Sequence, residues 1–313
     1  MSRVTLSDGR KVTLFELPPA GFDPLTASAE ALRRYGFPSM PDLPRHRQRY
    51  QRVLRQVGSR LRMVTPELQV LPRHISHPRR PPLVPATEEG TGWSGGVVSP
   101  GLGTFRWIQG NWVVPDLCPV DDRSASFSAW IGIDGDGQRN DGDQVFQAGV
   151  FMTSIRRGSS IETTCKIFEE WFPDPPALID NFVVRPGDYL SLVLCSRQGA
   201  GSTEGTAFFL NRTTGVGTAV SLDPPAGITL NGRCAEWIVE VLSDAGGIQL
   251  PFPDYGEVFF SDCEAVTTTG AVVFGGTGDN IRAFGVETLS VLSEGTLVSP
   301  TVVQCQYMGP LLG

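Results

Sequence analysis

Two polar side chains stand inside apolar runs of this sequence, and together they could activate a water molecule. Gln147 lies in the run VFQAGVF (145–151), and Glu236 lies in the run CAEWIVEV (234–241). A polar group buried in such a run needs hydrogen bonds or a function to balance the loss of its hydration. A carboxyl group that faces a carboxamide can hold a water molecule and remove its proton.

The distribution of histidine narrows the chemistry further. All three histidines, His46, His74 and His77, fall within the first 90 residues. The rest of the chain must therefore transfer protons without imidazole, which excludes Ser-His and Cys-His nucleophiles and histidine-built zinc sites there. The six cysteines contain no CxxC spacing, so neither a metal nor another cofactor is expected. Carboxylates remain as the acid and base candidates.

The elements that carry Gln147 and Glu236 are predicted to be strands. Because side chains alternate across a strand, Gln147 should share a face with Gly149 and Phe151, and Glu236 with Ile238 and Glu240. From about residue 105 onward, short alternating runs are separated by Gly, Pro, Asn and Asp, with no helical period of useful length. The pattern predicts an all-β body, an antiparallel sandwich or barrel.

Charge divides the chain near residue 90. Residues 1–90 hold 15 Lys and Arg against 8 Asp and Glu, a net charge of +7, and the remaining residues hold 11 against 25, a net charge of −14. Opposite charges of this size favour docking of the front on the body. We therefore predict two regions, 1–90, which ends in a Pro-rich linker, and 91–313.

The basic front is predicted to be partly helical. A hairpin is expected over 4–15, and a short helix is expected between Ser28, its cap, and Gly36, its stop. Apolar residues at helical spacing predict an amphipathic basic helix over 45–63. Docking on the body is favoured over nucleic-acid or membrane-surface binding, because no nucleic-acid motif accompanies the arginines.

Compartment is not decided by the sequence. No apolar stretch reaches membrane length, and charged residues occupy the place of a signal segment in residues 1–20. Six cysteines would suit disulfides in an oxidising compartment. A monomer without membrane or nucleic-acid partners is expected.

Four segments, taken in order, carry a family resemblance. They are WSGGVV (93–98), AWIGIDGD (129–136), EEWFP (169–173) and AEWIVE (235–240). In this succession, over roughly residues 91–310, the chain resembles the glutamic peptidases, or eqolisins.

The resemblance implies a concanavalin-like β-sandwich whose concave sheet carries a catalytic Gln and Glu, at Gln147 and Glu236. Positions that line or support the substrate groove match Trp93, Trp130, Asp134, Glu170 and Trp171. Two departures affect the shape of the groove. Phe168 stands two places before the matched Glu170, where the family often has an aromatic directly before it, and the loop before Gln147 is long.

The expected function is an acid-active endopeptidase that works without a covalent intermediate and resists inhibitors of paired-aspartate proteases. Residues 1–90 are expected to act as a prosegment and intramolecular inhibitor, although the secretion signal usual in the family is not recognisable. Two alternatives stay open: a glycoside hydrolase that uses Glu170 and Glu236, and a non-catalytic carbohydrate or peptide binder. A calcium loop at Asp134, Asp136, Asp141 and Asp143 is disfavoured because the EF-hand pattern fails at Arg139 and Val145.

Overall fold

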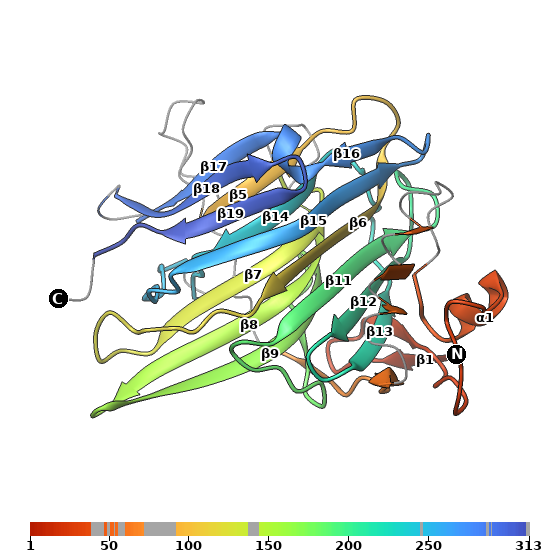
Figure 1. Cartoon of the computed structure of the whole chain (residues 1–313), viewed down its shortest axis with the longest axis horizontal. Coiled ribbons are helices and arrows are strands. Elements are labelled where there is room, and N and C mark those ends of the chain that lie inside the picture. Colours follow the sequence, from red (N-terminus) through yellow and green to blue (C-terminus); the bar gives the residue numbers. More distant parts are fainter. Residues whose placement is uncertain are drawn as a thin grey trace.

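The computed structural model shows two antiparallel sheets stacked face to face, which confirms the predicted all-β sandwich (Figure 1). It describes residues 1–38, 47–48, 51–52, 54–55, 60–71, 92–136, 144–244, 247–285, 288 and 290–310. The predicted helix over 45–63 lies largely outside these residues, and so do the linker, Asp141 and Asp143.

Sheet B carries both Gln147 and Glu236. Its strands follow the spatial order β4 (Leu68–Val70), β10 (Ala177–Ile179), β9 (Ser160–Phe172), β8 (Val145–Arg157), β7 (Ala125–Ile133), β14 (Ala235–Glu240), β5 (Trp93–Val98) and β17 (Asp279–Phe284). The two longest, β8 and β9, form a hairpin whose turn begins at Gly158 with φ 61°. A positive φ at the first turn residue matches the twist of a two-residue hairpin and favours glycine.

Sheet A covers the other side of the core. Its order is β1 (Ser2–Thr5), β2 (Lys11–Leu14), β13 (Val216–Leu222), β12 (Gly205–Asn211), β11 (Tyr189–Ser196), β6 (Phe105–Val113), β15 (Glu257–Thr267), β19 (Val302–Tyr307), β18 (Val291–Ser299) and β17. The short strand β3 (Arg62–Met63) runs parallel to β13, and β16 (Val272–Phe274) pairs with β15 ahead of the 3-10 turn η3 (Gly275–Thr277). Because β17 pairs with both β18 and β5, it joins the two sheets along one side.

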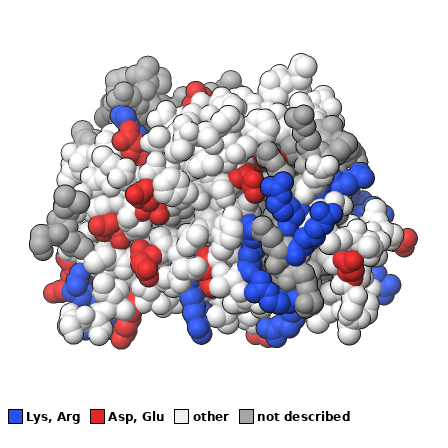
Figure 2. Space-filling model, viewed as in Figure 1, with Lys and Arg blue, Asp and Glu red and all other residues white. Residues whose placement is uncertain are grey.

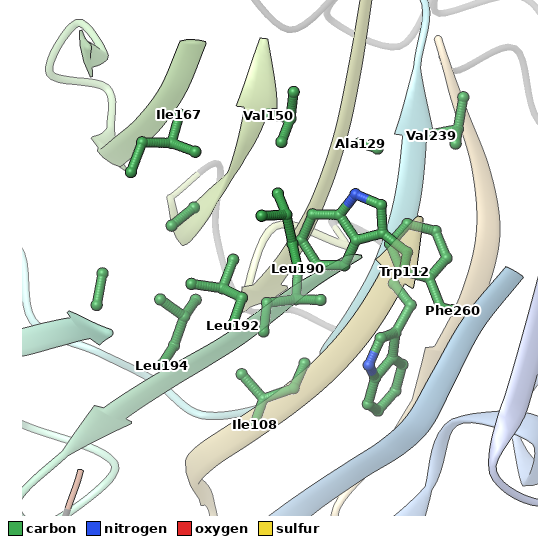
Figure 3. Close-up of a cluster of buried hydrophobic side chains, with 14 of the residues drawn as sticks. Ile108, Trp112, Ala129, Val150, Ile167, Leu190, Leu192, Leu194, Val239 and Phe260 are labelled. Carbon is green, nitrogen blue, oxygen red and sulfur yellow. The ribbon is translucent and has the colours of Figure 1, made fainter. Parts of the chain in front are cut away.

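The main core fills the space between the sheets. From sheet A it receives Ile108, Trp112, Leu190, Leu192, Leu194 and Phe260, and from sheet B it receives Ala129, Val150, Ile167 and Val239 (Figure 3). These residues take alternate positions along their strands, as a half-buried strand requires. The polar positions between them on β8 and β14 are therefore directed to the opposite face of sheet B.

The described N-terminal segment packs on sheet edges and on the outer face of sheet A. The predicted hairpin is confirmed as β1 and β2, and the predicted helix is confirmed as α1 (Ala29–Arg34). The Ser28 side chain accepts a hydrogen bond from the Ala31 amide at 3.1 Å, and Gly36 follows the helix with φ 76°. Figure 2 shows Lys and Arg gathered over this segment and the adjoining end of sheet A, while most acidic side chains in that view lie elsewhere.

Two further findings bear on the sequence predictions. The six cysteines all lie in the described part of the chain, and they form no disulfide. Among the described residues, no helix has both the length and the hydropathy to cross a membrane.

Candidate active site

Gln147 and Glu236 lie in one row across sheet B, with a glycine between them. The register pairs Gln147 on β8 with Gly132 on β7, and Gly132 in turn with Glu236 on β14. Residues paired across neighbouring strands point to the same face of a sheet. The two side chains therefore stand on one face, two strand spacings of about 4.8 Å apart. The Trp130 ring and Val145 lie close to the glycine between them.

Glu170 extends the row on the far side of Gln147. It pairs with Gln147 across β8 and β9, and the Gln147 Nε2 donates a hydrogen bond to Glu170 Oε2 at 2.6 Å. Both side chains are almost completely buried. This bond fixes which end of the carboxamide is the nitrogen, because only the nitrogen can donate to a carboxylate.

A small pocket opens beside this pair. Its volume is about 20 Å³, room for about one water molecule. Its lining comes from sheet B and from residues at the ends of β4 and β14: Leu71, Ser128, Gln147, Phe151, Phe168, Glu170, Pro176, Leu178, Glu240 and Leu242. Apolar walls with a few polar groups are typical of sites that bind organic ligands.

The thiol of Cys234, directly before strand β14, binds Glu236. Cys234 is two residues earlier, so the alternation of the strand places both side chains on the same face. The Cys234 Sγ donates a hydrogen bond to Glu236 Oε1 at 2.9 Å, and both side chains are fully buried. The bond restrains the orientation of the Glu236 carboxyl group, because it holds Oε1 toward the thiol.

Glu240 and the two tryptophans form the other end of the groove face. The Trp130 indole Nε1 donates to Glu240 Oε2 at 2.9 Å, and the Ser128 hydroxyl donates to the same oxygen at 3.4 Å. Trp93 packs edge-on against Trp130, with ring centroids 4.9 Å apart. Trp130 is fully buried and Trp93 is 8% exposed, so both rings pack beneath the surface on this face of sheet B.

Asp134 is a structural support for the loop that leads into β14. Its two carboxyl oxygens accept hydrogen bonds from the backbone amides of Asn231, at 2.7 Å, and Arg233, at 2.8 Å. Burial raises the pKa of Asp134, while these backbone donors oppose that rise. These two hydrogen bonds fix the backbone that leads to Cys234 and Glu236.

Trp171 and Glu169 lie on the opposite face of β9 from Glu170. Trp171 is 1% exposed and stacks on Phe146 in the main core, with ring centroids 4.9 Å apart, so it does not line the groove. The Glu169 carboxyl is fully buried, and neither of its oxygens has a hydrogen-bond partner in the described structure. Burial raises the pKa of Glu169 to about 8, and the Arg10 charge opposes this rise.

A carboxyl group and an amide on one face of a sheet can remove a proton from water and stabilise a developing oxyanion. In the described part of the chain, no three His, Cys, Asp or Glu side chains gather as metal ligands would.

Sequence reasoning missed two contributors to this region. Cys234 could have been found by applying strand alternation to the residue two places before Glu236. Leu71 could not, because nothing in the linear sequence indicates that the end of β4 meets the Gln147 pocket.

Comparison with known proteins identifies the family and the fold. The family model described as the peptidase A4 family matches residues 91–307. No similar sequence is found among the curated proteins. Among solved structures, scytalido-glutamic peptidase with a transition state analog inhibitor aligns with a TM-score of 0.56 and 24% identity, over 69% of this chain and 98% of that one.

A second similar structure is SCP-B, a member of the eqolisin family, in a complex with the tripeptide Ala-Ile-His. It has a TM-score of 0.52 and 22% identity, over 69% of this chain and 98% of that one. At these identities the two structures show a shared fold, whereas the family model spans most of the sequence. The chain belongs to the peptidase A4 family, the glutamic peptidases or eqolisins that its motifs resemble.

Proposed function

We propose that the protein is an acid-active endopeptidase in which Glu236 and Gln147 activate a water molecule, with no covalent intermediate. The observation that carries this proposal is the row Gln147–Gly132–Glu236, which places a carboxyl group and a carboxamide on one face of sheet B, on the two strands that flank β7.

The reaction assigns one task to each group. Glu236 removes a proton from the water as it attacks the peptide carbonyl, and later delivers that proton to the leaving nitrogen. The Gln147 nitrogen donates to Glu170, and an amide nitrogen carries a second N–H group. In the reaction the Gln147 amide donates to the oxyanion, a stabilisation whose loss costs about 10²–10³ in rate for one such donor.

The acid pH range follows from the type of base. An ordinary glutamate has a pKa of about 4.3, so it is ionised and able to act as a base in mildly acidic solution. No histidine is needed, and none occurs beyond residue 77.

The two alternatives have less support. Glu170 and Glu236 stand three strands apart, about 14 Å at the backbone, and Glu170 binds the Gln147 amide. Paired carboxylates of glycosidases lie about 5–9.5 Å apart. A binder that stacks ligands on tryptophan would need exposed rings, whereas Trp130 is fully buried.

The proposal extends to the N-terminal segment as an intramolecular inhibitor and to polypeptides as substrates. The charge difference between the two regions supports it, and so does Leu71, whose side chain lines the pocket with Gln147 and Glu170. Incubation in acid should cut the chain between Arg73 and Thr91 and raise activity. A chain that stays full-length and is fully active would contradict the inhibitory role.

The test is digestion of a protein substrate from acid to neutral pH by wild type, Glu236→Gln and Gln147→Ala. Both variants should keep their fold and lose at least about 10² in kcat, as removal of an oxyanion donor or a general base does. Glu162→Gln, at an exposed position of β9, is the control and should keep full activity. Unchanged turnover in Glu236→Gln, or inhibition by a paired-aspartate inhibitor, would refute the proposal.

A further inference from the structure

We propose that residues 2–71 belong to the folded unit at neutral pH and stay bound to the body there when the connection between residues 71 and 92 is cut. These residues precede the region that the family model matches. Four sets of contacts join them to the body.

The first contact completes the free edge of sheet A. On β13, residues Val220, Ser221 and Leu222 pair with β2, while Val216 and Gly217 pair with β3. The Arg62 and Val64 amides add backbone hydrogen bonds to Gly215 and Gly217, each at 2.9 Å. A long uncovered strand edge is an aggregation site, so β2 and β3 protect nearly the whole of β13.

The second contact completes the same side of sheet B. Strand β4 pairs with β10 over three residues. The Asn181 side chain binds the segment twice, accepting from the Glu67 amide at 3.0 Å and donating to the Thr65 carbonyl at 2.8 Å. At their other side the sheets are joined by β17, so the N-terminal strands cover the edges that β17 leaves open.

The third contact is apolar and lies on the outer face of sheet A. Leu32, Phe37 and Leu54 are each less than 5% exposed, and they pack in one cluster with Phe208 and Trp107. The rings of Phe37 and Phe208 are 5.4 Å apart. Removing the segment would expose this apolar patch to water, which is unfavourable in proportion to its area.

The fourth contact is a buried charge. Arg10, between β1 and β2, binds Asp8 at 2.6 Å and lies 4.0 Å from Asp174, which follows β9. It is also the cation whose field opposes the desolvation of Glu169 inside the sandwich. The Arg10 side chain is only 9% exposed, and its charge lies between the carboxylates of Asp8 and Asp174. Removing the cation from a largely buried group of charges is strongly destabilising.

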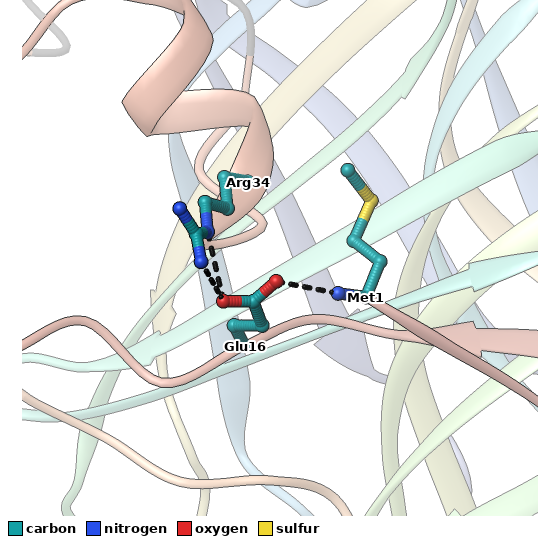
Figure 4. Close-up of polar contacts among 3 residues, drawn as sticks. All are labelled: Met1, Glu16 and Arg34. Carbon is teal, nitrogen blue, oxygen red and sulfur yellow. Dashed lines mark hydrogen bonds and ion pairs between the residues drawn. The ribbon is translucent and has the colours of Figure 1, made fainter.

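The segment is also held together internally. Glu16 accepts hydrogen bonds from the N-terminal amine of Met1 at 2.9 Å and from Arg34 of α1 at 2.8 Å, which ties the hairpin to the helix (Figure 4). These partners lower the pKa of Glu16 to about 2, with the Arg34 hydrogen bond as the largest cause. The hairpin and helix can therefore remain one unit after a cut beyond residue 71.

The test places a recognition sequence for a specific protease between residues 76 and 86 of the full chain and cuts the folded protein at neutral pH. The two pieces should elute together in size-exclusion chromatography and unfold in one thermal transition. Elution of the N-terminal piece alone, leaving a folded body, would overturn the proposal. This readout does not use peptidase activity, so it is independent of the proposed catalytic function.

A matched pair of variants tests the contribution of Arg10. In the cut protein, Arg10→Met should release the N-terminal piece at least about tenfold faster, because it takes the largely buried cation away from Asp8 and Asp174. Arg3→Met removes an exposed ion pair with Asp223 across the same interface and should change the release rate less than about threefold. Equal release rates in the two variants would show that the Arg10 charge does not hold the segment.

Discussion

At the scale of single residues, the candidate site depends on how each polar group is held. Gln147 is oriented by Glu170, Glu236 by Cys234, and Glu240 by Trp130. Each proposed catalytic group therefore has a buried neighbour that fixes its direction, which is a requirement for catalytic geometry. The thiol partner of Glu236 is the least expected of these neighbours, since a thiol is a weak donor.

Cys234 is predicted to position Glu236. Cys234→Ala removes the donor, and loss of one hydrogen bond of about 1 kcal/mol corresponds to a roughly fivefold lower kcat with little change in KM. Cys234→Ser keeps a hydroxyl donor and should retain most of the wild-type kcat. Steady-state kinetics on a peptide substrate measure both. If the serine variant lost as much kcat as the alanine variant, the thiol would be serving only to fill space.

At the scale of elements, the row of Gln147 and Glu236 depends on strand β7, because it places a glycine between the two strands that carry them. A Cβ at Gly132 would lie 2.8 Å from the Trp130 ring, 3.1 Å from Val145 and 3.4 Å from the Gln147 Cβ. A side chain there would therefore push on the Trp130 ring and on Gln147. Pairing of β7 with both neighbours brings Gln147 and Glu236 into one row.

Gly132→Ala is predicted to damage catalysis more than folding. Overpacking costs about 1–3 kcal/mol of unfolding free energy, whereas a displaced catalytic group costs about 10² in kcat/KM. Gly110→Ala is the control, because its Cβ would press on Ile131 and Trp237 at 3.0 Å inside the core. Urea unfolding should show similar losses for both variants. An equal loss of kcat/KM in both variants would mean that the position between Gln147 and Glu236 has no special part in catalysis.

Much of this element-scale arrangement could be predicted from sequence alternation. The rule placed Gln147 with Phe151, and Glu236 with Glu240, on the faces that the structure shows. Applied to the segment 169–173, the same rule would also have separated Trp171 from Glu170. The family resemblance matches Trp171 to a position that lines or supports the groove. In the structure its ring lies in the core, against Phe146.

At the scale of the whole molecule, the long-range partners of the N-terminal segment could not be predicted. Net charge indicated that the front docks on the body, but the main contacts are strand edges and apolar side chains. Strand pairing between residues more than 100 positions apart leaves no local signal in the sequence, because either partner would read as a strand with any neighbour. The approach of Arg10 to Asp174 is of the same non-local kind.

Glu169 makes the stability of the whole molecule depend on pH. Its pKa is raised from the usual value near 4.5 to about 8 in the folded protein, first by burial and then by Glu170, Asp8 and Asp174, against the opposing Arg10 charge. The folded state therefore holds a proton that the unfolded chain has lost between these two values. The contribution of Glu169 to stability is fully present below pH 4.5 and is lost as the pH rises toward 8, at up to about 1.4 kcal/mol per pH unit.

Urea unfolding of the whole chain between pH 4.5 and pH 8 should consequently show a falling unfolding free energy. Glu169→Gln keeps the shape of the side chain but cannot ionise, so its free energy of unfolding should fall less steeply and exceed that of wild type near pH 8. Glu162→Gln, an exposed position on the same strand, should follow the wild-type slope. A Glu169→Gln slope identical to wild type would place the Glu169 titration outside this range. The direction of the effect would favour the folded enzyme in acid, where the proposed base Glu236 is expected to act.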